Sequence, residues 1–180
     1  MSELKSKRTV CFPSRVFDRA FPAKLVQRDW TSDKRLLHDL QASWRAQYAE
    51  YLGQDEADSL VDRLLACGSL YAHDTRYTLQ ATIDDRCAGI CSLRPMTDSG
   101  ELGLITLLEV SENYRHRGVG RQLVRALETV SDSVMAHVSI HRPDVKKFYE
   151  SLGFHCLERT HIDHYGHQLA FDVVARRCAA

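Results

Sequence analysis

Hydrophobic and polar positions in the first part of the chain follow a helical period. Apolar residues recur every three or four positions from 33 to 52, and Gly53 follows this segment. The spacing predicts an amphipathic helix, because side chains three and four residues apart share one helix face. A second helix is expected after Asp55, which can cap its first turn, and before Gly68. A short strand over 24–29 is expected to precede both helices.

In the middle of the chain, the hydrophobic pattern changes to one that is typical of β-strands. Apolar residues alternate with polar ones over 77–83, and a second run over 87–93 returns after the pair Asp84-Asp85. This pattern indicates a β-hairpin. The run over 102–110 is almost continuously apolar, which is typical of a central strand that is buried on both faces.

The last third of the chain alternates between helix and strand. Helical spacing of apolar residues over 119–130 predicts a helix, and the run over 134–140 predicts a strand. Another helix is expected from Pro143 to Gly153, because proline fits a first helical turn and glycine fits the position after the last one. Two final strands are expected at about 155–162 and 168–175. The order predicts an α/β (α+β) single-domain sandwich, with a mixed, mostly antiparallel sheet of six to seven strands and about four helices.

Composition narrows the class of protein. The 180 residues are 44% apolar and 27% charged, with a formal net charge of zero, which fits one globular domain and argues against a nucleic-acid partner. The sequence has neither an 18-residue apolar run nor the apolar core of a secretory signal, so we expect a cytoplasmic protein without a membrane partner. None of the six cysteines lies in a CxxC pair or a zinc-spaced cluster, so no metal is expected.

Three segments are expected along the chain. Residues 1–23 contain two prolines and scattered basic residues, and form an N-terminal extension that is either mobile or draped on the domain. The domain covers 24–176, and 177–180 form a short tail.

The segment Arg115-His116-Arg117-Gly118-Val119-Gly120-Arg121 lies between the buried strand and an amphipathic helix. Glycine lets backbone N–H groups approach an anion closely, and a helix N-terminus adds N–H donors and a favourable dipole. A pyrophosphate group fits this arrangement. A dinucleotide fingerprint would need a third glycine where Leu123 stands, and a P-loop would need Gly-Lys-Ser/Thr. A plain glycine turn with solvated arginines remains the alternative.

A second motif, Phe148-Tyr149-Glu150-Ser151-Leu152-Gly153-Phe154, closes the later helix. Residues 115–120 match the Arg/Gln-x-x-Gly-x-Gly/Ala motif, and 148–154 match the Phe-Tyr-x-x-x-Gly-Phe stretch, of the GNAT superfamily of N-acetyltransferases. The chain resembles this family over roughly residues 24–175. The resemblance implies acetyl-CoA as co-substrate, no metal, and transfer of an acetyl group to a primary amine in a ternary complex.

The resemblance also implies roles for individual residues. The backbone of Leu108 and Val110 would pair with pantetheine, and one of their N–H groups would polarise the thioester carbonyl. Tyr149 would protonate the leaving thiolate. Arg142 stands where the family often has an asparagine, and it could instead reach a phosphate. The pyrophosphate would be held by the turn residues Arg115, His116, Arg117, Gly118, Val119, Gly120 and Arg121.

The general base is less specified than the acid. Glu109 lies on the central strand, and simple alternation points it away from Leu108, on whose face Thr106 and Leu104 are expected. A β-bulge, common in the family at this place, would re-aim Glu109. Four histidines near the following strand and the last turn are further candidates: His141, His161, His164 and His167.

The family places the acceptor between the first two helices and the last hairpin. A small-molecule or peptide amine is expected there, and a homodimer is a further expectation because dimers are common in the family. Six residues could form an aromatic, acidic mouth, or be ordinary core and surface residues: Tyr48, Glu50, Tyr51, Asp55, Glu56 and Asp163. Two other functions stay open, a non-catalytic coenzyme A-binding module and a toxin that acetylates aminoacyl-tRNA.

Overall fold

The computed structural model describes residues 24–27, 34–66, 77–84 and 86–178. The elements follow the predicted order and are, from the N-terminus, β1 (Lys24–Gln27), α1 (Lys34–Leu52), α2 (Gln54–Ala66), β2 (Tyr77–Ile83), β3 (Arg86–Pro95), β4 (Leu102–Val110), the 3-10 helix η4 (Glu112–Tyr114), α3 (Val119–Leu127), β5 (Ser133–Ser139), α4 (Pro143–Ser151), β6 (His155–His164) and β7 (His167–Arg177).

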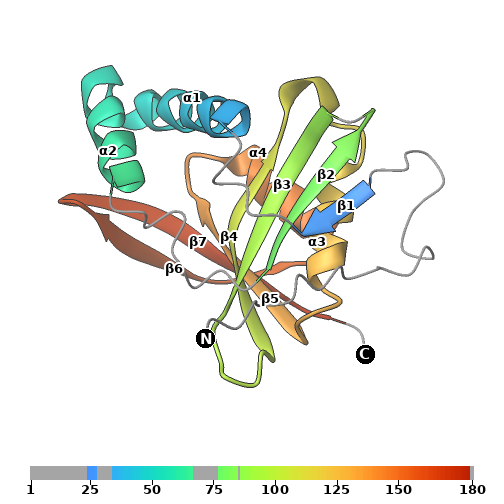
Figure 1. Cartoon of the computed structure of the whole chain (residues 1–180). Coiled ribbons are helices and arrows are strands. Elements are labelled where there is room, and N and C mark those ends of the chain that lie inside the picture. Colours follow the sequence, from blue (N-terminus) through green and yellow to red (C-terminus); the bar gives the residue numbers. More distant parts are fainter. Residues whose placement is uncertain (1–23, 28–33, 67–76, 85, 179–180) are drawn as a thin grey trace, which may run out of the picture.

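The described residues form one seven-stranded sheet, with strand order β1-β2-β3-β4-β5-β7-β6 (Figure 1). The pair β4–β5 is parallel, and the other five neighbouring pairs are antiparallel. The predicted fold class, a mixed and mostly antiparallel sheet flanked by helices, is therefore confirmed. As predicted from its apolar run, β4 occupies the central position.

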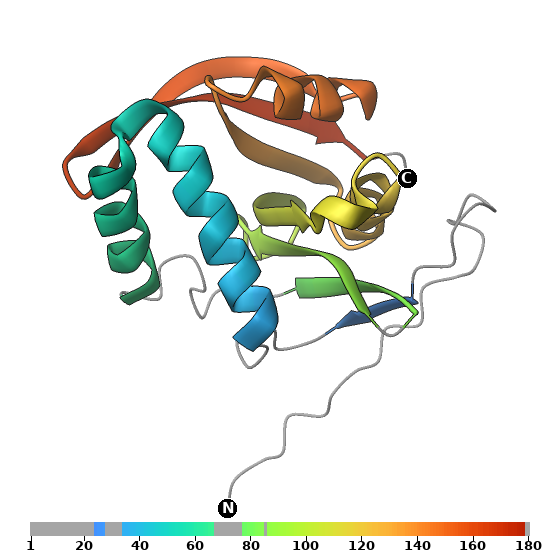
Figure 2. The ribbon, with the colours of Figure 1, turned by 90° about the horizontal axis from the view of Figure 1, so that it is seen from above.

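Helices cover both faces of the sheet (Figure 2). The larger core joins α3 and α4 to one face, through fully buried residues such as Leu123, Leu127 and Phe154. On the other face, Leu40 and Trp44 of α1 pack on Leu107 of β4. Apolar side chains are therefore buried against both faces of β4. This burial stabilises the layered arrangement of helices and sheet.

Strands β4 and β5 pair over only part of their length. Their register runs from Leu102–Ser133 to Ile105–Ala136, although β4 continues to Val110 and β5 to Ser139. Beyond Ala136, β5 keeps its pairing with β7. The two central strands therefore diverge, and the sheet has an opening between residues 106–110 of β4 and the end of β5.

A β-bulge at Thr106 changes the facing of β4. Leu93 of β3 pairs with Ile105 and Ser92 pairs with Leu107, so Thr106 is the extra residue. As a result Ile105 and Leu108 pack in the same core although they are three residues apart. The expectation that Leu104 shares the face of Leu108 was wrong, because the bulge interrupts the alternation between them.

Small differences from the predicted boundaries have local causes. The third helix ends at Leu127, and Val130 reaches the same core from the turn that follows. Strand β7 continues to Arg177, and the next N–H, that of Cys178, donates to the carbonyl of Asp132 at 2.7 Å. The expected extension over 1–23 lies outside the described residues. Within the described part of the chain, no helix is both long and apolar enough to cross a membrane.

Candidate functional site

The backbone of β4 presents hydrogen-bonding groups to the opening. In an antiparallel pair, alternate residues direct their N–H and C=O groups towards the partner strand. The N–H of Ser111 donates to the carbonyl of Ala88 of β3 at 3.0 Å. Val110 and Leu108, one and three residues before Ser111, therefore direct their backbone groups away from β3. Their backbone groups therefore point into the space that β5 leaves, where an extended ligand can add as a strand.

The glycine turn follows directly at the end of β4. Gly118 is the N-cap of α3 with φ +83°, and His116 has φ +59°. Both values lie in the left-handed region, which glycine adopts without steric cost. A Cβ on Gly118 would have open space around it, so the glycine is required by its conformation and leaves room beside the helix N-terminus, where unpaired N–H groups attract anions.

Close packing sets the position of α3 against the sheet. A Cβ on Gly89 of β3 would lie 2.9 Å from the carbonyl oxygen of Glu109 and 3.2 Å from Val119. A Cβ on Gly120 would lie 3.3 Å from the ring of Phe148. These two glycines let the first turn of α3 approach the end of β4, which brings the helix N-terminus next to the opening.

The three arginines of the turn do not act alike. Arg115 reaches back to β4, where its Nε donates to the carbonyl of Val110 at 3.1 Å and its Nη2 binds Glu109 at 3.0 Å. Arg117 lies over the ring of Tyr114, at 5.9 Å from the centroid, and Arg121 is exposed on the first turn of α3. Arg117 and Arg121 thus remain the cations that could meet a phosphate, while Arg115 fixes the strand end.

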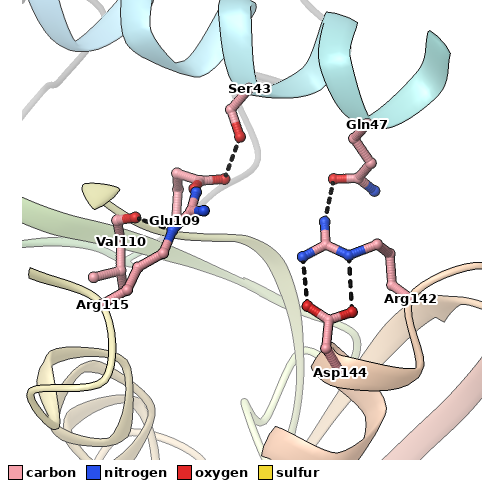
Figure 3. A network of polar contacts seen from close by, with 7 residues as sticks. All are labelled: Ser43, Gln47, Glu109, Val110, Arg115, Arg142 and Asp144. Atoms are coloured by element: carbon pink, nitrogen blue, oxygen red, sulfur yellow. Dashed lines mark hydrogen bonds and ion pairs between the residues drawn. The ribbon is translucent and has the colours of Figure 1, made fainter. Parts of the chain in front are cut away.

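Arg142 lies on the other side of the opening, as the N-cap residue of α4. Its guanidinium makes two hydrogen bonds to Asp144, at 3.0 and 2.8 Å, and a third to Gln47 of α1 at 3.1 Å (Figure 3). The hydrogen bonds with Asp144 are the main cause that raises the pKa of Arg142 above its ordinary value. The side chain therefore joins α4 to α1, and does not lie at the glycine turn.

Tyr149 is placed by the C-terminal cap of α4. Gly153 has φ +86°, and the N–H groups of Gly153 and Phe154 donate to Glu150 at 2.9 Å and Tyr149 at 3.1 Å. This is a Schellman motif, in which the residue after the glycine contacts the start of the last turn. The motif thus explains the Phe-Tyr-x-x-x-Gly-Phe stretch. Tyr149 is only 4% exposed, and burial raises the pKa of its hydroxyl, which keeps it protonated.

Glu109 faces α1. As simple alternation predicts, Glu109 lies on the side of Leu107, opposite Leu108 and Val110, and it accepts a hydrogen bond from Ser43 of α1 at 3.4 Å. The bulge at Thr106 precedes this stretch and does not re-aim Glu109. Its other carboxylate oxygen binds Arg115. The residue is therefore at the rim of the opening and has partners from two other elements.

His137 is a residue that the sequence reasoning missed. It follows Ala136, the last β5 residue paired with β4, and lies on the opposite face to Ala136 and Val138, which are in the main core. His137 is exposed to solvent at this edge, but desolvation by the groups packed around its ring, with a smaller contribution from Arg94, lowers its pKa. An imidazole that stays neutral at neutral pH can accept a proton. Alternation along β5 could have identified it.

A cleft of about 240 Å³ lies near the end of β5. It is lined by Tyr51, Leu52, Ser139, His141, His161, Gln168, Leu169 and Ala170. Tyr51 and His141 stack with their ring centroids 4.6 Å apart, and Ser139 adds a hydroxyl to the same lining. The cleft thus lies between the C-terminal end of α1 and the β6–β7 hairpin, the region in which the acceptor was expected.

None of the described residues that line this cleft is a carboxylate. Glu56 is 3.4 Å from His167, and Asp163 accepts hydrogen bonds from Gly166 and Gln168. Glu50 and Asp55 are exposed. Tyr48 packs with the apolar residues under α1 and α2. The side chain of His164 lies outside the described residues.

The residues present fit a coenzyme A ligand in two respects. The opening offers β4 backbone that β5 does not pair with for an extended amide chain, and the turn beside it offers glycine-rich backbone and exposed arginines for a pyrophosphate. Among the described residues, no group of three or more His, Cys, Asp or Glu side chains is arranged to hold a metal ion.

Solved structures with this fold include coenzyme A-binding proteins. The PaiA N-acetyltransferase of Thermoplasma acidophilum, in complex with coenzyme A, is 14% identical with a TM-score of 0.65, over 87% of this chain and 99% of that one. Arabidopsis thaliana NAA60, in complex with acetyl-CoA, is 17% identical with a TM-score of 0.56, over 86% and 97%. At these identities the likeness concerns the fold alone.

The family assignment comes from the sequence itself. No protein of curated function matches the chain. The model of the acetyltransferase (GNAT) family matches residues 34–154, which include both helices of the first pair, the central strand, the glycine turn and the Tyr149 motif. The chain therefore belongs to the GNAT family of acetyltransferases.

Proposed function

We propose that this protein transfers the acetyl group of acetyl-CoA to a primary amine, by direct attack in a ternary complex. The single observation that carries the proposal is the opening between β4 and β5, with the glycine turn at its end. One continuous surface then offers a strand-like backbone for pantetheine and a helix N-terminus for pyrophosphate. The turn residues His116 to Arg121 hold the pyrophosphate in this proposal. Arg115 contributes by fixing the end of β4 through its hydrogen bond to the carbonyl of Val110.

The reaction has two needs that nearby groups can meet. A backbone N–H of Leu108 or Val110 stabilises the oxyanion that forms when the amine attacks, a contribution of roughly 2.7–4 kcal/mol for one well-placed donor. Tyr149 donates its proton to the leaving thiolate. Burial raises the pKa of this hydroxyl, so it is in the protonated state that a general acid needs.

Two groups at the rim can take the proton from the amine. His137 is a neutral imidazole at the point where β4 and β5 diverge, and Glu109 is a carboxylate on the α1 side of β4. A water molecule could relay the proton to either group, or to His141 or His161 in the cleft. Arg142 supports the α1 side of the site through Gln47.

The cleft beside Tyr51 is the proposed acceptor site. Its lining combines hydroxyl, imidazole and amide groups with apolar walls, which suits a small-molecule or peptide amine that carries hydrogen-bonding groups. We place the protein in the cytoplasm, and a homodimer remains part of the proposal.

A thermal-shift titration tests the coenzyme assignment, with acetyl-CoA, free coenzyme A and NAD as ligands. A ligand at 100 times its dissociation constant stabilises the native state by about 2.7 kcal/mol. We expect acetyl-CoA and coenzyme A, but not NAD, to raise the melting temperature. An amine screen with detection of free thiol then follows. No shift at millimolar acetyl-CoA would reject the proposal, and a shift without transfer to any amine would favour a coenzyme-binding module.

A further inference from the structure

Glu109 has its two carboxylate oxygens engaged by different parts of the molecule. Oε1 accepts from Arg115 at 3.0 Å and Oε2 accepts from Ser43 at 3.4 Å (Figure 3). The Glu109 side chain is 21% exposed. These two contacts make Glu109 a link between the glycine turn and α1.

Arg115 makes this link sensitive to the turn. It is the first residue of the turn 115–121, and its guanidinium holds both Glu109 and the carbonyl of Val110. If the turn moves when it binds an anion, Arg115 therefore moves the carboxylate of Glu109 and the carbonyl of Val110, the last residue of β4, at the same time. Hydrogen bonds from a planar guanidinium are directional, so a movement of Arg115 would change both contacts together.

One face of α1 connects this link to the acceptor cleft. Ser43, Gln47 and Tyr51 are four residues apart, so their side chains lie in a row along the helix. Ser43 binds Glu109 on the β4 side of the opening, and Gln47 binds Arg142 on the α4 side. Tyr51 lines the cleft. The helix thus spans the opening and ends at the proposed acceptor site.

We propose that Glu109 is a positioning residue that couples the glycine turn to α1, so that coenzyme binding at the turn orders the acceptor cleft. This inference rests on the proposed function. It assigns the proton transfer to another group, such as His137 or a water molecule, and it makes acceptor affinity depend on the coenzyme.

Hydrogen–deuterium exchange measured with and without free coenzyme A tests the coupling without turnover. In the wild-type protein we expect coenzyme A to protect amides in 115–127 and also in α1. In Glu109→Gln, which loses the ion pair to Arg115, protection should persist in 115–127 and disappear from α1. Ser43→Ala, which leaves the carboxylate in place, should give the same loss. Glu112→Gln removes one negative charge from an exposed residue of η4 and should behave as the wild type.

Kinetics provide the second measurement. Glu109→Gln should raise the KM for the acceptor roughly 5- to 150-fold, the usual range of coupling between sites, while the pH profile of kcat/KM keeps its shape. A fall in kcat of roughly 10²–10⁴-fold with loss of the acidic limb would make Glu109 the base and overturn the proposal.

The outcomes separate the two proposals. Protection of 115–127 without any protection of α1 in the wild type would refute the coupling and leave the coenzyme site in place. Retained α1 protection in Glu109→Gln would also refute it. Absence of protection anywhere would reject the coupling and the proposed function together.

Discussion

The ring of Phe154 packs edge-on against the ring of Tyr149, with centroids 5.0 Å apart, and the N–H of Phe154 donates to the Tyr149 carbonyl. The cap that ends α4 is thus also the device that orients Tyr149. Its ring has a structural role, as its burial shows, while its hydroxyl is the part that the proposed reaction uses. These two roles can be separated by removing the oxygen alone.

Tyr149→Phe should lower kcat roughly 100-fold or more, because a general acid commonly contributes 10²–10⁴-fold. The ring contacts stay, so the melting temperature and the dissociation constant for coenzyme A should change little. Steady-state kinetics and a binding titration measure these quantities. Tyr77→Phe, at a partly buried tyrosine packed against the same core, is the matched control. Unchanged turnover in Tyr149→Phe would remove this residue from the mechanism.

Gly118→Ala should weaken coenzyme A binding. Alanine in the left-handed region costs roughly 1–2 kcal/mol, so the turn would relax away from the conformation that presents its N–H groups. Gly166 has φ +92° in the β6–β7 turn, and a Cβ there also has open space. Gly166→Ala should therefore lower stability by a similar amount without changing coenzyme A affinity. Calorimetric titration of both variants tests this, and equal affinities would show that the turn does not hold the ligand.

Tyr51→Phe should raise the KM for the acceptor and leave coenzyme A affinity unchanged. The variant removes a hydroxyl from the lining of the cleft but keeps the ring that stacks on His141. Ser139→Ala removes a second hydroxyl from this lining and should also raise the KM for the acceptor. An unchanged acceptor KM in both variants, or a change in coenzyme affinity instead, would place the acceptor elsewhere.

Asp172→Asn should destabilise the protein in a pH-dependent way. Asp172 of β7 binds Arg159 at 2.9 Å and Lys146 at 2.7 Å, and these hydrogen bonds, that to Arg159 first, lower the pKa of its carboxyl. A lowered carboxyl pKa gives stability that is present above the unfolded value near 4 and is lost as the pH falls through the folded value.

At pH 7 the variant should lose about 1–2 kcal/mol of unfolding free energy, near the low end for charged hydrogen bonds because both cations are partly exposed. Urea denaturation at pH 7 and at pH 3 measures the difference, which should shrink at the lower pH. A deficit that is constant with pH would mean that packing, and not the charge, is responsible.

Most of the fold follows from local signals in the sequence. The helical period of α1, the hairpin of β2 and β3 and the Pro143–Gly153 boundaries of α4 all depend on residues close in the chain, and all three were predicted. The resemblance indicated a bulge in this strand, but its position at Thr106 required the structure, because a run that is apolar on both faces has no alternation to interrupt. The facing of Glu109 away from Leu108 follows simple alternation and was predicted.

The parts of the candidate site that depend on backbone conformation were predictable from the sequence. Gly118 and the first turn of α3 occupy the place that the motif indicated. The side-chain partners of Arg115 and Arg142 were not predictable, because they lie on strand and helix segments far away in sequence, as the contact of Arg142 with Gln47 illustrates. The positions of His137 and the cleft depend in the same way on how β5 and β7 pair.

The extra residue in β4 also has a consequence for comparing this chain with its distant relatives. Before Thr106 the odd-numbered residues face one side of the sheet and the even-numbered residues face the other, and after it the two sides are exchanged. An alignment of relatives that is anchored at Leu102 can therefore confuse the two faces of the sheet by the time it reaches Glu109. Counting backwards from Gly118 avoids the error, since no bulge interrupts the pairing of 107–110 with β3. Equivalence of residues at the end of this strand should therefore be judged from the turn, and a relative without the insertion would present a different side chain to α1.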